Sequence, residues 1–267
     1  MEIGLSTASL FSKAKTEAAF EILRKLDISV CEVFLSTLSE YKDDFIDSLA
    51  QAKGNIRVHS THALTNQFEP ELFNPQERTR KDCEEIFLQV AKADKKLGAS
   101  YYTFHGPGKF KRLPYVHNYE KLGKRVQELY EMLLLATDGK TQMSYENVHW
   151  TYFNEPEYFL NLKKYTEVKT CLDIKQAFLS GYDIYDYVDV MADRLVTLHL
   201  CDFDENGKLA IPGKGSFDFE KLFRVLLQKG FDGAALIEVY ANNYDTFDEL
   251  RWSFDHLNEC LYKAKNQ

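Results

Sequence analysis

Four ionisable residues stand alone in otherwise apolar runs of this sequence, and their types suit metal-assisted chemistry. They are Glu146, Asp173, His199 and Glu238. If the three carboxylates meet at one place, mutual repulsion and loss of water would raise the pKa of each by whole units. A divalent cation among them would offset that cost. The sequence therefore predicts a metal site built from these four side chains.

The donor types narrow the choice of metal. Two Glu, one Asp and one His supply oxygen and imidazole ligands, which favours Mn²⁺ or Co²⁺, with Mg²⁺ or Zn²⁺ as alternatives. Any single one of these residues could instead be a hydrogen-bonded or salt-bridged polar group. Their recurrence in four successive strand-like runs favours the metal site.

Eight short apolar runs alternate with longer amphipathic segments. The predicted strands are residues 2–6, 30–35, 56–60, 100–105, 143–148, 169–174, 194–200 and 234–240. Strands that are apolar on both faces and alternate with helices are typical of a parallel sheet covered by helices. We predict one α/β domain over residues 1–267, a single (β/α)8 TIM barrel, whose active site lies at the carboxyl ends of the strands. An open doubly wound sheet is the alternative.

One helix has clear start and stop signals. We predict that it opens at Asn74 as N-cap, with Pro75 in its first turn, and that it closes at Gly98.

Composition favours small substrates over nucleic acid. Lys+Arg 33 against Asp+Glu 41 gives a formal net charge of −8, which disfavours a polyphosphate partner. The five cysteines include no CxxC pair, which argues against a disulfide framework and a zinc knuckle. The N-terminus lacks a signal-peptide pattern, and no run approaches the roughly 20 apolar residues of a membrane span. We expect a cytoplasmic protein without membrane contact, for which a homo-oligomer is compatible with the sequence.

Several motifs carry a family resemblance. They are Glu146-Asn147, Cys171-x-Asp173, His199-Leu200-x-Asp202, Ile237-Glu238, His105-Gly106-Pro107-Gly108, and Pro212-Gly213-Lys214-Gly215 followed by Asp218-Phe219. This set, which spans nearly the whole chain, resembles the xylose isomerase-like barrel superfamily. That superfamily includes endonuclease IV and the sugar isomerases and epimerases.

Departures from the family motifs separate its branches. Endonuclease IV has a histidine three residues after the sixth-strand aspartate and an Asp-x-His before the glycine turn. This chain has Gln176 at the first position and no Asp-x-His in residues 207–211. The four ligands of the ketose epimerase branch are all present. That branch commonly has a histidine at the position of Gln176 and an arginine at that of Glu205.

The resemblance implies a metal-dependent isomerase or epimerase of a sugar or sugar phosphate. Glu146 and Glu238 would remove and return a proton next to a carbonyl, through an enediolate that the metal stabilises. The resemblance also implies substrate-binding roles for further polar residues, which are His62, His105, Gln176 and Lys214.

Some assignments stay open at this stage. His59 competes with His62 for the place at the barrel mouth, and the basic residues 109–112 could receive a phosphate. Three other functions are compatible with the same ligands. They are an inosose-type dehydratase, an abasic-site endonuclease with an incomplete metal cluster, and a sugar-binding barrel without catalysis.

Overall fold

The computed structural model describes residues 1–64, 67–108, 118–151 and 154–266. Its eight main strands are β1 (Glu2–Ser6), β2 (Val30–Leu35), β3 (Arg57–Ala63), β4 (Tyr101–Phe104), β5 (Gln142–Glu146), β6 (Lys169–Asp173), β7 (Leu195–Leu200) and β10 (Ala234–Ile237). They close into a parallel barrel in the order β1, β10, β7, β6, β5, β4, β3, β2. The predicted TIM barrel is confirmed, and the open sheet is excluded.

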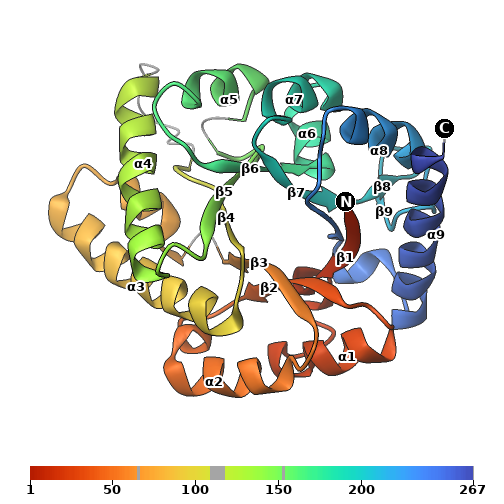
Figure 1. Cartoon of the computed structure of the whole chain (residues 1–267), viewed down its shortest axis with the longest axis horizontal. Helices are drawn as coiled ribbons and strands as arrows, with labels where there is room; N and C mark the ends of the chain where they lie inside the picture. The colour runs from red at the N-terminus through yellow and green to blue at the C-terminus, as the bar shows by residue number, and fades with distance from the viewer. Residues whose placement is uncertain (65–66, 109–117, 152–153, 267) are drawn as a thin grey trace.

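The α-helices surround the barrel (Figure 1). They are α1 (Ala19–Lys25), α2 (Asp43–Ala52), α3 (Glu77–Leu97), α4 (Tyr119–Ala136), α5 (Pro156–Leu162), α6 (Ile174–Ser180), α7 (Ile184–Met191), α8 (Phe219–Gln228) and α9 (Phe247–Lys265). Short additions include the 3-10 helix η5 (Glu69–Phe73) and the antiparallel pair β8 (Asp202–Phe203) and β9 (Leu209–Ala210).

The predicted C-terminal end of α3 is correct, and its predicted N-terminal end is not. Gly98 follows the helix in the left-handed conformation at φ 70°, as predicted for a C-terminal cap. The predicted start is wrong: α3 begins at Glu77, with Gln76 as its N-cap. The Asn74 side chain instead accepts a hydrogen bond from the backbone N–H of Gln76, which forms a turn ahead of the helix.

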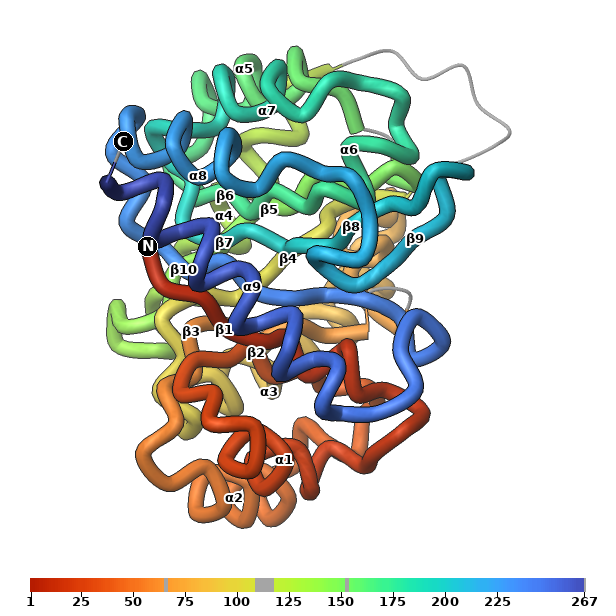
Figure 2. The backbone as a smooth tube through the Cα atoms, turned by 90° about the vertical axis from the view of Figure 1, so that its right-hand side faces the viewer, coloured from red at the N-terminus to blue at the C-terminus, as the bar shows by residue number. Residues whose placement is uncertain are grey.

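A cluster of buried polar side chains lies inside the barrel. Ser6, Glu32, Ser60, Thr103 and His199 come from five strands, and all are buried. Buried polar groups need partners, and here the other four side chains all contact Glu32. Figure 2 shows both chain termini at one end of the barrel and the β8–β9 pair at the other end, where the strands finish.

Among the described residues, every helix is too short or too polar to cross a membrane.

Candidate active site

The four predicted ligands meet inside the barrel. His199 Nδ1 lies 3.2 Å from Glu146 Oε1, 3.3 Å from Glu238 Oε2 and 3.8 Å from Asp173 Oδ2. All four side chains are buried. Glu146, Asp173 and His199 lie in β5, β6 and β7, whereas Glu238 is the first residue after β10. The structure therefore brings the four residues together around a single nitrogen.

The separations around His199 Nδ1 are near those between ligands of a divalent cation. Around His199, the described donors that are close enough to share one ion are Glu146 with Cys171, and Glu32 with Glu238. Asp173 belongs to neither group as the side chains stand. Bonds of about 2.1 Å would place neighbouring ligand atoms about 3 Å apart, close to the distances around His199 Nδ1. Asp173 Oδ2 and Glu238 Oε2 are buried and accept no hydrogen bond from the described residues. Buried oxygens without hydrogen bonds are costly, and a bound ion would add to the ion pairs that these two oxygens already make with Lys175 and His199.

Lys175 adds a positive charge that we did not predict. Its Nζ lies 3.4 Å from Glu238 Oε1 and 3.5 Å from Asp173 Oδ2, and its side chain is only 7% exposed. Glu238 contacts Lys175 through Oε1 and His199 through Oε2, whereas Asp173 faces both through the same oxygen, Oδ2. In the sequence, Lys175 looks like an ordinary polar residue in the first turn of a helix.

The carboxylates differ in how easily they ionise. Burial raises the pKa of Asp173 to about 7, and Glu146 and Glu238 add to this effect against the opposing charge of Lys175. Burial also disfavours ionised Glu238, but His199 and Lys175 outweigh it and lower the pKa of Glu238 to about 2. The protein groups alone thus leave one of the three carboxyl groups partly protonated near neutral pH.

His62 and His105 form a second group beside the first. Their Nε2 atoms are 2.8 Å apart, and His105 Nε2 lies 3.0 Å from Glu146 Oε2. Glu69 of η5 holds the other side of His105, with its Oε2 2.9 Å from Nδ1 and 3.0 Å from the backbone nitrogen. The donors of His62, His105 and Glu146 are close enough to share a metal ion. Glu69 was missed because it lies in a connection without periodicity.

The structure separates His62 from His59. The register between β2 and β3 shifts so that Glu32 lies beside Ser60, while Cys31 lies beside Val58, which leaves His59 as an extra residue. His59 Nε2 contacts Thr197 Oγ1 at 2.9 Å, and burial with the nearby Arg57 lowers the pKa of His59 to about 4. His62 is the histidine of β3 that lines the cavity.

A cavity of about 450 Å³ opens above these groups. Gln176 lines it, and the Oε1 of Gln176 accepts a hydrogen bond from the backbone N–H of His149. The cavity walls also carry aromatic side chains, which are Phe11, Phe34, Trp150 and Tyr240. Aromatic faces suit the apolar C–H surface of a sugar.

Lys214 lies elsewhere. It pairs with Glu249 of α9 and is not among the described residues that line the cavity. Asp202 accepts hydrogen bonds from the backbone N–H groups of Gly213 and Gly215, each at 3.0 Å, so the glycine turn has a structural explanation. Substrate binding by Lys214 stays a prediction. The basic residues 109–112 lie outside the described part of the chain.

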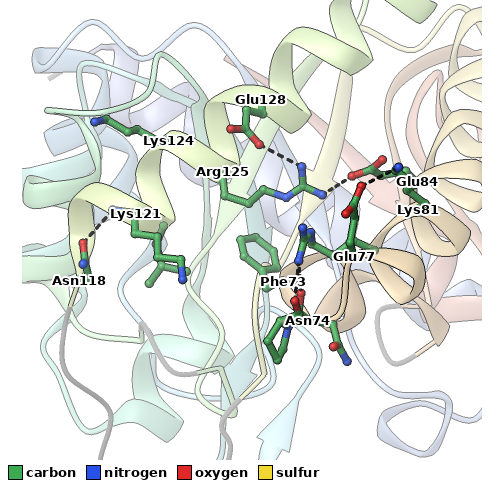
Figure 3. Close-up of a pocket in the computed structure, with 13 residues that line it drawn as sticks. Phe73, Asn74, Glu77, Lys81, Glu84, Asn118, Lys121, Lys124, Arg125 and Glu128 are labelled. Carbon is green, nitrogen blue, oxygen red and sulfur yellow. Dashed lines mark hydrogen bonds and ion pairs between the residues drawn. The ribbon is translucent and has the colours of Figure 1, made fainter.

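A larger cavity of about 910 Å³ lies between α3 and α4. Figure 3 shows Arg125 between Glu84 and Glu128, with which it forms ion pairs, and Lys81 of the same cavity pairs with Glu77. None of the predicted site residues is among the described residues that line this cavity, whereas Glu146 and Glu238 line the smaller one, so we place the candidate active site there.

Comparison with known proteins identifies a matching family. A family model described as xylose isomerase-like TIM barrel matches residues 18–260.

Two curated relatives are similar over part of the chain. A probable endonuclease 4 from Aquifex aeolicus (strain VF5) is 27% identical over 153 residues, or 54% of this chain and 50% of that protein. An inosose dehydratase from Clostridium perfringens (strain ATCC 13124) is 24% identical over 195 residues, or 73% of this chain and 60% of that protein. The chain therefore matches between half and two thirds of the length of these relatives.

Solved structures match over nearly the whole chain. D-psicose 3-epimerase from Clostridium cellulolyticum H10, with D-tagatose, shares 16% identity at a TM-score of 0.79, covering 98% of this chain and 99% of that chain. The IOLI protein, with a binding zinc atom, shares 18% identity at a TM-score of 0.79, covering 99% of each chain. At these identities the likeness establishes the fold.

Proposed function

This chain belongs to the xylose isomerase-like TIM barrel family, and from that premise we propose that it is a divalent-metal-dependent isomerase or epimerase of sugars or sugar phosphates. The observation that carries the proposal is the convergence of three carboxylates on His199 Nδ1 at 3.2–3.8 Å. The similarity of the fold to that of a sugar epimerase agrees with it.

Glu146, Asp173, His199 and Glu238 would hold the metal. When bound, the cation supplies positive charge next to the carbonyl and hydroxyl oxygens of a sugar. The donor set favours Mn²⁺ or Co²⁺, and the zinc atom in the IOLI structure keeps Zn²⁺ as an alternative. The five cysteines are free thiols, which suits the cytoplasmic location that we propose.

Glu146 and Glu238 are the proposed proton-transfer groups. Both line the cavity, and β7 and β6 separate their strands in the barrel order. They therefore approach a bound sugar from different directions. One carboxylate can take the proton from the carbon next to the carbonyl, and the other can return a proton to the opposite face.

The remaining polar groups of the cavity would orient the substrate. His62, His105 and Gln176 line it and are able to hydrogen bond to sugar hydroxyls. A volume of about 450 Å³ lies within the usual range of small-molecule sites. These features suit a monosaccharide or a sugar derivative of similar size.

The test is a screen for solvent deuterium incorporation. Metal-free protein is loaded in turn with Mn²⁺, Co²⁺, Mg²⁺ or Zn²⁺ and mixed with ketoses, aldoses and their phosphates in D₂O. We expect NMR to show deuterium at a carbon next to the carbonyl of one substrate. Glu146→Gln and Glu238→Gln should each lower turnover by about 10²–10⁴-fold, whereas Glu259→Gln on the exposed face of α9 should not. Full activity in either site variant would contradict its proposed role.

A cyclic polyol dehydratase is the second candidate, because one relative is an inosose dehydratase. Such an enzyme could begin with the same proton abstraction but would release water. Inosose is therefore included in the screen, and NMR of the product distinguishes loss of water from inversion of a stereocentre.

An endonuclease is the third candidate, on the similarity to probable endonuclease 4 and the grouping of His62, His105 and Glu146. The net charge of −8 disfavours it. Incision of a duplex with an abasic site at low salt is the direct check.

A further inference from the structure

Glu32 is a fully buried carboxylate at the centre of the barrel interior. It lies in the middle of β2, and hydroxyl groups from β1, β3 and β4 donate hydrogen bonds to it. These come from Ser6 Oγ at 3.0 Å, Ser60 Oγ at 2.8 Å and Thr103 Oγ1 at 2.7 Å. Three donors hold this carboxylate in one orientation, so its free electron pairs point in defined directions.

The remaining contacts of Glu32 are with two imidazoles. Its Oε1 lies 3.1 Å from His199 Nε2 and 3.3 Å from His62 Nδ1. By geometry neither nitrogen makes a hydrogen bond to any described group, Glu32 included, so these two contacts are close ion-pair approaches. The two rings are stacked, with centroids 5.9 Å apart and planes inclined by 16°. Among the described residues, Glu32 Oε1 is the carboxylate oxygen nearest to each of the two nitrogens, and Glu238 Oε2 lies 3.7 Å from His62 Nδ1.

The orientation of His199 matters because its nitrogens face different groups. Nε2 faces Glu32, whereas Nδ1 faces the carboxylates of Glu146, Asp173 and Glu238. Histidines that bind metals generally donate their other ring N–H to a carboxylate, carbonyl or water, and this partner fixes both the tautomer and the ring orientation. For His199, Glu32 Oε1 at 3.1 Å from Nε2 is the carboxylate oxygen placed to meet that requirement.

We propose that Glu32 is a positioning residue of the metal site, which accepts the Nε2 proton of His199 and so directs Nδ1 toward the three carboxylates. Through the same oxygen it restrains His62, so one carboxylate aligns an imidazole from each of two strands. This inference rests on the proposed metal site and adds to it a residue outside the ligand set.

The test measures metal affinity and the histidine tautomer separately from turnover. Glu32→Leu removes the acceptor, and Glu32→Gln keeps an acceptor oxygen without the charge. Calorimetric titration with Mn²⁺ should show weaker binding by about 10–100-fold for Glu32→Leu and a smaller loss for Glu32→Gln. Asp94→Asn is the matched control, because Asp94 is a buried carboxyl group of α3 that contacts Thr61 and lies outside the cavity. Its affinity should match that of the wild type.

Nitrogen-15 NMR of the zinc-loaded protein gives the second measurement. We expect Nε2 of His199 to carry the proton in the wild type and this signature to be lost in Glu32→Leu. Wild-type affinity together with an unchanged His199 signal in folded Glu32→Leu would overturn the inference. If that variant does not fold, Glu32→Gln decides, because affinity equal to that of the wild type would also overturn it. Failure of the wild type to bind any of the four metals would instead contradict the proposed function.

Discussion

His199 and Lys175 are the two described basic side chains that contact both Asp173 and Glu238 in the site. At the scale of single residues, His199 Nδ1 contacts all three carboxylates, and Lys175 contacts Asp173 and Glu238 from another direction. Burial and the neighbouring Glu146 and Glu238 raise the pKa of Asp173, so each positive charge in the site reduces a large electrostatic cost.

Replacing Lys175 should therefore destabilise the metal-free protein. Breaking a buried ion pair from one side costs about 3–5 kcal/mol, so we expect Lys175→Met to lower the free energy of unfolding by about that amount. Lys214→Met is the control, because its pair with Glu249 is half exposed and is worth about 1 kcal/mol or less. Urea denaturation in the presence of a chelator measures both variants, and equal losses would contradict a special role for Lys175.

Among single residues, the strength of the sequence signal decided what could be predicted. Glu146, Asp173 and His199 were found because each is a lone ionisable group near the end of an apolar run. Glu32 has the same signal in the middle of its strand, where a buried carboxylate has no expected place. Lys175 has no such signal, because its burial depends on contacts with Asp173 and Glu238, which are 2 and 63 residues away in the sequence.

At the scale of elements, the turn after β4 sets the position of His105. Gly106 adopts φ +78°, and a Cβ atom there would lie 1.9 Å from Tyr145 Oη. Tyr145 is fully buried in the core, so it cannot easily move away. This glycine allows the backbone to turn tightly against β5 and leaves the His105 side chain beside Glu146.

Gly106→Ala should consequently be much more costly than Gly98→Ala. Gly98 also has positive φ, at +70°, but nothing lies within 4 Å of its added Cβ, so only a backbone strain of about 1 kcal/mol is expected there. At Gly106 the steric overlap adds to that strain, and we expect a loss of about 3 kcal/mol or more. Thermal unfolding of the two variants, compared with the wild type, checks the difference. Similar melting temperatures for the two variants would contradict the steric argument, because they would mean that the Tyr145 side chain can move away from the added Cβ at little cost.

The strands were easier to predict from sequence than the connections. Parallel strands buried on both faces leave continuous apolar runs, and every predicted strand overlaps an observed one. The conformation of the connections depends on local hydrogen bonds, which the spacing of apolar residues does not reveal. Asn74 binds the N–H of Gln76 rather than capping α3, and η5 brings Glu69 to His105 only after the chain has folded.

At the scale of the whole molecule, a buried acid outside the site links stability to pH. Burial raises the pKa of Asp94 to about 8, although a hydrogen bond from Thr61 opposes the shift. Its pKa in an unfolded chain is about 3.9. Between these values the folded state holds a proton that the unfolded state has lost, so the contribution of Asp94 to stability falls as pH rises.

Asp94→Asn should remove this contribution. The wild type should lose up to about 1.4 kcal/mol of stability per pH unit between about pH 4 and pH 8 from this residue. The free energy of unfolding of the variant should fall less steeply over that range. The free energy of unfolding of the variant minus that of the wild type should therefore increase toward pH 8. Urea unfolding at pH 5, 6, 7 and 8 measures this difference. Parallel pH profiles for the two proteins would contradict a raised pKa for Asp94.

The central claim is that Glu146, Asp173, His199 and Glu238, from three strands and the residue that follows a fourth, hold one divalent cation in the barrel. Calorimetric titration of chelator-treated protein with Mn²⁺ tests it most directly, with Asp173→Asn measured in parallel. We predict one ion per chain for the wild type and little or no binding for the folded variant. Wild-type protein that takes up no divalent ion, or a variant that binds as tightly as the wild type, would contradict the account.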